Sequence, residues 1–145
     1  MAQVSSRLET IRRLDAGSTW TVGICNGVQW LGRAGLIQGR RVTTNWAVRE
    51  QVAAYGATVV PERWCQDGKL FTGAGVSASI DAALALTGLI ANEAVARTVQ
   101  LGIEYYPQPP YGNGTPEQAP EMARHLVRQF EASSLERLRS KRPPV

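Results

Sequence analysis

Residues 21–31, TVGICNGVQWL, constrain the fold of this chain most strongly, because they read as a strand, a sharp turn and a helix. Alternating apolar residues predict a strand over residues 20–24. Asn26 and Gly27 tolerate the unusual backbone angles that a tight turn requires. The apolar pattern that begins at Gly27 predicts a helix to about residue 34. Cys25 therefore lies at the turn between strand and helix.

A cysteine at such a turn has two interpretations. In the first, the N–H groups at the start of the helix favour the thiolate, which is the nucleophilic form of Cys25. The backbone N–H groups of Asn26 and Gly27 are then candidates for binding an oxyanion. In the second, Cys25 is a small buried residue at the end of a strand, as free cysteine often is. The residue types alone leave both open.

Helical and extended segments alternate along the rest of the chain, which predicts an α/β fold. Asn45 is a natural N-cap, and Asp67-Gly68 between two extended runs predicts a hairpin. The helix over residues 79–91 is apolar nearly all round, so we expect it to be buried against a sheet or a partner. The other expected elements are a helix over 7–16, extended segments at 41–44 and 57–60, a helix over 46–55, a helix capped by Asn92 and a last helix after Pro120.

Length and composition predict one domain with an ordinary core. The chain has 145 residues and a net charge of +4, and its basic residues are scattered rather than interleaved with aromatic side chains. We therefore expect no nucleic-acid partner, and no apolar run is long enough to cross a membrane. One histidine and two distant cysteines predict neither a metal site nor a disulfide framework, and the default compartment is the cytoplasm.

Four ordered motifs together resemble the ThiJ/PfpI family. They lie at residues 23–28 (GICNGV), 34–47, 73–81 and 103–111. The resemblance covers roughly residues 19–123. It is specific to the branch that contains isonitrile hydratases and the amidotransferase-like domains of some AraC-type regulators.

The resemblance implies an α/β, flavodoxin-like three-layer sandwich with a β-hairpin insertion. It divides the chain into an N-terminal helix (1–18), a partial α/β domain (19–131) and a basic tail (132–145). It makes Cys25 the nucleophile of a strand-to-helix elbow, with Asn26 beside it in the catalytic pair. The residues it places around the bound molecule are Gly27, Thr44, Asn45, Gly75 and Ser77. No cofactor is implied.

Two departures from the family matter for function. Asn45 stands where the family's segment usually has histidine, so a group that could assist the cysteine is replaced. The family's domain normally begins with βα units that precede residue 7 in this comparison, and these carry an acidic residue that contacts the cysteine. We therefore expect a fragment, a split subunit, a misassigned start or a degenerate relative, with a second copy or a completing subunit covering the open sheet edge.

Two functions follow from the resemblance. The first is hydration of an isonitrile to an N-substituted formamide through a thioimidate on Cys25. The second is a non-catalytic module that senses a ligand or dimerises, like the domain of AraC-type regulators. The expected small molecule is an electrophile in the first case and a ligand in the second.

Overall fold

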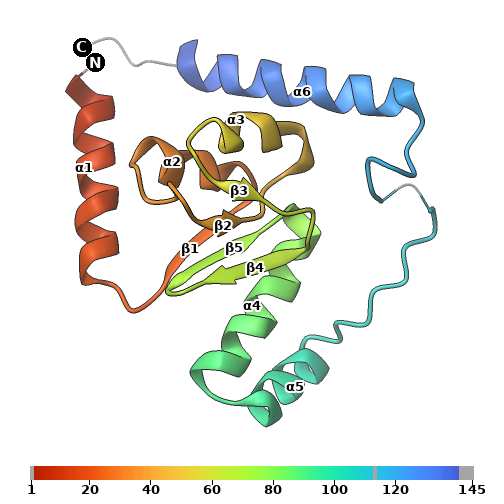
Figure 1. Cartoon of the computed structure of the whole chain (residues 1–145). Helices are drawn as coiled ribbons and strands as arrows, with labels where there is room; N and C mark the ends of the chain where they lie inside the picture. Colours follow the sequence, from red (N-terminus) through yellow and green to blue (C-terminus); the bar gives the residue numbers. More distant parts are fainter. Residues whose placement is uncertain (1, 113, 141–145) are drawn as a thin grey trace. The chain divides into compact units, whose positions relative to one another are not determined.

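The computed structural model describes residues 2–112 and 114–140, which form an α/β chain of two compact units (Figure 1). The first unit runs to Tyr105 and the second begins at Tyr106. The first contains α1 (Ala2–Gly17), β1 (Thr21–Ile24), η1 (Cys25–Gly27), α2 (Val28–Arg33), β2 (Arg41–Val42), η2 (Trp46–Val48), α3 (Arg49–Ala53), β3 (Thr58–Val59), β4 (Trp64–Asp67), β5 (Leu70–Gly73), α4 (Val76–Ile90) and α5 (Glu93–Gly102). The second contains α6 (Glu121–Ser140). Residues 141–145 of the expected basic tail lie outside the described residues.

The larger sheet contains the strand that precedes Cys25 and both strands of the hairpin. Its strand order is β1-β5-β4, with β1 parallel to β5 and β4 antiparallel to β5. A second, two-stranded sheet pairs β2 with β3 in parallel. In the first sheet Ile24 lies opposite Gly73, so β1 and β5 end at the same edge (Figure 1). The residues that follow these two strands therefore meet there, which is where ligands bind in open α/β sheets.

The predicted hairpin is present, with its turn one residue later than expected. Asp67 pairs with Leu70, which leaves Gly68 and Lys69 as the two loop residues. Gly68 has φ +60° and Lys69 has no positive φ. That combination is typical of a type II′ turn, whose first position favours glycine.

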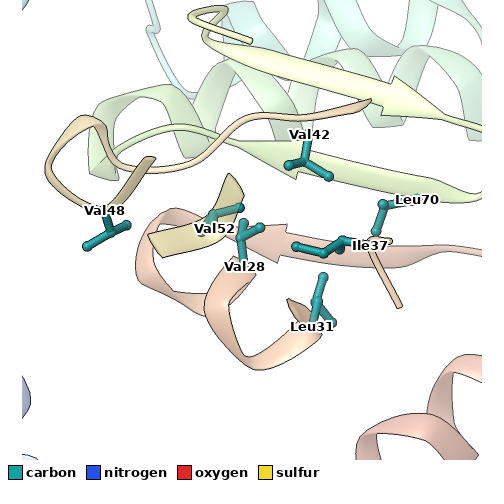
Figure 2. Close-up of a cluster of buried hydrophobic side chains, with 7 residues drawn as sticks. All are labelled: Val28, Leu31, Ile37, Val42, Val48, Val52 and Leu70. Atoms are coloured by element: carbon teal, nitrogen blue, oxygen red, sulfur yellow. The ribbon is translucent and has the colours of Figure 1, made fainter. Parts of the chain in front are cut away.

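A single apolar cluster fills the space between the sheets and the short helices (Figure 2). Val28 and Leu31 enter it from α2, Val52 from α3 and Leu70 from β5, and Ile37, Val42 and Val48 complete it. The apolar residues that follow Cys25 are thus anchored in the core. Their burial fixes where α2 begins, and with it the place of the cysteine turn.

The other face of the sheet carries aromatic residues and α4. Phe71 is fully buried, stacks on Trp64 with ring centroids 5.2 Å apart, and meets the edge of Trp20 at 6.4 Å. The buried residues of α4 are Ala78 and Ala82. The exposed large apolar residues on α4 are Val76, Ile80, Leu89 and Ile90. The expectation of burial against a sheet is therefore met by one side of the helix, and burial against a partner stays a prediction.

Acid should destabilise the chain partly through Asp67. Its carboxylate accepts hydrogen bonds from the Arg41 backbone N–H (2.9 Å) and the Arg40 guanidinium (3.2 Å), and these lower its pKa. Because the folded pKa lies below the unfolded value of about 3.9, this stabilisation is present above that pH and is lost as the pH falls through the folded pKa. We expect Asp67→Asn to flatten the fall in unfolding free energy below about pH 4, as denaturant titrations across pH would measure. An unchanged slope would contradict this assignment.

Candidate active site

The backbone at Cys25 has the geometry of an elbow. β1 ends at Ile24, and Cys25 opens η1 with φ +53°. A positive φ is uncommon outside glycine, and such positions persist only where surrounding contacts hold them. The Cys25 carbonyl oxygen accepts hydrogen bonds from the Val28 backbone N–H and from the Thr44 hydroxyl (2.8 Å). These two bonds hold the cysteine in its unusual conformation.

The sulfur of Cys25 lies between two amide side chains and is partly exposed. The Nδ2 atom of Asn45 donates to Sγ at 3.4 Å. On the other side the thiol can donate to Oδ1 of Asn26, 4.0 Å away. An anionic sulfur keeps the first contact and loses the second, since a thiolate only accepts hydrogen bonds. Neither amide is a base, so this arrangement can hold a thiolate but cannot take its proton.

Three buried threonines position the segment that carries Asn45. Thr43, Thr44 and Thr72 are each 0% exposed. The backbone N–H of Thr43 donates to the Thr72 hydroxyl (2.9 Å), and the Thr43 hydroxyl donates to the Glu62 carbonyl (2.7 Å). The Thr72 hydroxyl in turn donates to the Cys65 carbonyl oxygen at 3.3 Å. Because buried hydroxyls must be paired, this network fixes residues 43–45 against β5 and β4.

The structure brings four of the predicted site residues together, namely Cys25, Asn26, Thr44 and Asn45. Thr44 is buried and contacts the Cys25 backbone, so its hydroxyl supports the turn. The sequence analysis did not name Thr43 and Thr72 as functional residues, although Thr43 lies beside Thr44 in the extended segment expected over 41–44.

The other predicted site residues lie near the same sheet edge without a described contact to Cys25. Gly27 closes η1 and is exposed. Gly75 is the extended N-cap of α4, two residues beyond the strand position that pairs with Ile24. Ser77 is exposed, and its hydroxyl accepts from Arg63 at 3.4 Å. Their predicted role in binding stays a prediction.

A second polar cluster joins the residue before β4, α4 and the end of the first unit. The Asp81 carboxylate accepts from the Arg63 guanidinium and from the Tyr105 hydroxyl (2.6 Å). The hydrogen bond to Asp81 raises the pKa of Tyr105. A helix that begins near residue 79, as the sequence predicts, would have Asp81 in its first turn. The structure shows it further along α4, where it links three segments distant in sequence.

Further findings concern the described part of the chain. No three side chains of histidine, cysteine, aspartate or glutamate gather there to hold a metal ion. Nor does any helix among the described residues have the length and apolar character to span a bilayer. A cavity of about 410 Å³ lies along β4 and is lined by Cys65, whose thiol pKa burial raises. Cys65 is 3% exposed on β4, which is typical of a structural residue.

Removing the Thr44 hydroxyl should loosen the elbow. We expect Thr44→Val to lower the unfolding free energy by about 0.5–1.5 kcal/mol, the usual net value of one intramolecular hydrogen bond. The rate at which iodoacetamide alkylates Cys25 should also differ from the wild-type rate, because the Cys25 carbonyl oxygen loses a hydrogen-bond donor. Thr98→Val is the control, since its hydroxyl donates to the Ala94 carbonyl on exposed α5. Equal effects of the two variants on Cys25 alkylation would refute the assignment.

Comparisons with known proteins show what the chain is similar to. The sequence pattern of the DJ-1/PfpI family matches residues 2–88. Over 128 residues the chain is 41% identical to an isonitrile hydratase from Pseudomonas putida, covering 88% of this chain and 56% of that protein. The chain thus spans about half the length of this relative.

Solved structures support the predicted α/β, flavodoxin-like fold. A ThiJ/PfpI family protein from Pseudomonas syringae matches with a TM-score of 0.83 at 30% identity, covering 91% of this chain and 55% of that one. An AraC family transcriptional regulator from Pseudomonas putida matches with a TM-score of 0.62 at 18% identity, covering 68% and 55% of the two chains. The second likeness shows the fold alone.

Proposed function

The chain belongs to the DJ-1/PfpI family, and from that premise we propose that it hydrates an isonitrile to an N-substituted formamide with Cys25 as the nucleophile. The observation that carries the proposal is the elbow at Cys25, with φ +53° and an amide donor on the sulfur. Its occurrence in a chain 41% identical to an isonitrile hydratase supports the choice of substrate class.

The reaction divides into two steps. In the first, the Cys25 sulfur attacks the terminal carbon of the isonitrile. A new C–S bond forms, that carbon takes up a proton, and the product is a thioimidate. In the second step, water adds to the C=N carbon, the C–S bond breaks and the thiolate is regenerated. The released product is the N-substituted formamide, so the isonitrile gains one water and nothing is oxidised or reduced.

The neighbouring residues have separate parts in this proposal. Asn45 donates to the sulfur and so stabilises the thiolate that attacks and later leaves. Asn26, whose Oδ1 atom lies 4.0 Å from the Cys25 sulfur, is proposed to contact the bound molecule. Neither amide titrates, so in this proposal water takes up the thiol proton and supplies the proton that the carbon gains. We expect turnover to be slow compared with enzymes that carry a base.

A partner chain is part of the proposal. In the described residues β1 pairs with β5 alone, and Val22 on it is 47% exposed. An open strand edge with exposed apolar residues favours association. We therefore propose that a second copy or a completing subunit covers this edge.

The test is turnover by the purified chain. Incubation with an alkyl isonitrile should release the corresponding formamide, detected by mass spectrometry, at a rate above that of buffer with free cysteine. Absence of formamide from folded protein would overturn the hydratase proposal.

A second function is favoured by the partners of the Cys25 sulfur, which among the described residues are two amides, neither of them a base. In this alternative the chain senses a ligand or dimerises, without catalysis. Its fold is shared with an AraC family transcriptional regulator. It predicts a raised melting temperature in the presence of an isonitrile or amide, without formamide release, in the same samples.

A further inference from the structure

Asn45 uses both ends of its side-chain amide. Its Oδ1 atom accepts a hydrogen bond from the Ala47 backbone N–H at 2.9 Å, which caps η2. Its Nδ2 atom donates to the Cys25 sulfur at 3.4 Å. We propose that Asn45 is a positioning residue that holds Cys25 as an attacking thiolate through a donor that never titrates. The inference rests on the proposed function of Cys25.

The cap decides which way the amide faces. The oxygen and nitrogen of an asparagine side chain are nearly equal in size, so an unconstrained amide can rotate and present either one to the sulfur. Only an acceptor can bond to the Ala47 N–H, which assigns the oxygen to the cap. The nitrogen must then face Cys25, where it can only donate. A thiolate in this place meets a donor in every protonation state of the protein.

The surroundings keep Asn45 in register with the cysteine. The preceding residue, Thr44, is fully buried and donates to the Cys25 carbonyl. Thr44 thus contacts the backbone of Cys25, and its neighbour Asn45 contacts the side chain. The hydrogen bonds of Thr43 to Thr72 and Glu62 hold the same segment from the other side. The amide therefore reaches the sulfur from a rigid support, as a positioning group must.

The substitution Asn45→Asp removes the donor to the Cys25 sulfur and keeps the N-cap of η2. Aspartate has the same shape and caps helices as well as asparagine, so the Ala47 contact should survive. It presents a carboxylate oxygen to the sulfur in place of an N–H donor. A negative charge at this distance opposes a thiolate, so we expect iodoacetamide to label Cys25 at least about tenfold more slowly at pH 7. The half-maximal labelling rate should also move to higher pH.

Asn92→Asp is the matched control. Asn92 caps α5 by the same contact, with its Oδ1 atom accepting from the Val95 backbone N–H at 3.0 Å. The substitution changes charge and cap in the same way but has no described contact with Cys25. It should leave both the labelling rate and its pH profile unchanged. Labelling of Cys25 and Cys65 is distinguished by peptide mass spectrometry.

Asn45→Ser covers the case in which the aspartate variant does not fold. Serine keeps an N-cap acceptor but is too short to cap and to reach the sulfur at once. We expect a severalfold slower labelling of Cys25 without a new charge. Labelling of the folded serine variant, or of a folded aspartate variant, at the wild-type rate would overturn the inference.

These readouts do not depend on isonitrile turnover. Slower labelling of the Asn45 variants in a chain that releases no formamide would sustain the inference and remove the hydratase proposal. Normal labelling with formamide release would do the reverse.

Discussion

Replacing Cys25 by alanine should reduce isonitrile hydration by at least about a thousandfold, to the rate of buffer, because no C–S bond can then form. Alanine is small and apolar, so the core behind the elbow keeps its packing. Alanine and cysteine both carry a Cβ, so the cost of the positive φ at this position stays similar and the variant should fold. The measurement is formamide release under saturating isonitrile, with thermal unfolding as a check on the fold.

Cys65→Ala is the control for this experiment. It removes the other cysteine, which is buried on β4. We expect Cys65→Ala to keep the wild-type rate apart from a modest loss of stability. If the Cys25 variant retained turnover, or if only the Cys65 variant lost it, Cys25 would not be the nucleophile.

Phe71→Ala should have the largest effect on stability. The ring is fully buried, stacks on Trp64 and meets Trp20. Truncating such a side chain typically costs about 3–5 kcal/mol, a large part of the roughly 5–15 kcal/mol that stabilises a domain. We expect a melting temperature lower by about 10 °C or more, followed by circular dichroism.

The matched control is Phe130→Ala in the second unit. Phe130 lies on α6 and is 68% exposed. Its removal should change the unfolding free energy by no more than about 0.5 kcal/mol. A Phe71 variant as stable as the Phe130 variant would mean that the aromatic layer on β5 is not part of the core.

The sequence predicted those helices, caps and turns that depend on residues a few positions apart. The strand, turn and helix around Cys25 are present as expected. The unusual backbone angle falls on Cys25 itself (φ +53°), whereas Gly27 is helical with φ −59°, so the expectation that Asn26 and Gly27 would carry it was wrong. Asn45 and Asn92 are confirmed as N-caps, since each side chain accepts from a backbone N–H close in sequence. The hairpin is also confirmed, although its turn residues are shifted by one.

Contacts between distant residues could not be predicted in this way. The parallel pairing of β1 with β5 joins residues 21–24 to 70–73, and nothing in either stretch specifies the other. Asp81 meets Arg63 and Tyr105 only once α4 is packed on the sheet.

The first helix begins at Ala2, earlier than the expected start near residue 7, because the intervening residues continue it without a break.

The site was predicted in part for the same reason. The resemblance named Cys25, Thr44 and Asn45, and the structure brings all three together through hydrogen bonds. The different roles of Thr44 and Asn45 depend on which side chain is buried. Thr44 faces the core and the cysteine backbone, while Asn45 faces the sulfur. Sequence alone does not separate these two orientations for adjacent residues.

Intact-mass analysis of the chain during reaction with an alkyl isonitrile examines the bond on which the hydratase account depends. The account predicts a transient species heavier by one isonitrile, with the added mass on the peptide that contains Cys25, decaying as formamide accumulates. Formamide release with no adduct on that peptide, or an adduct found only on Cys65, would contradict it.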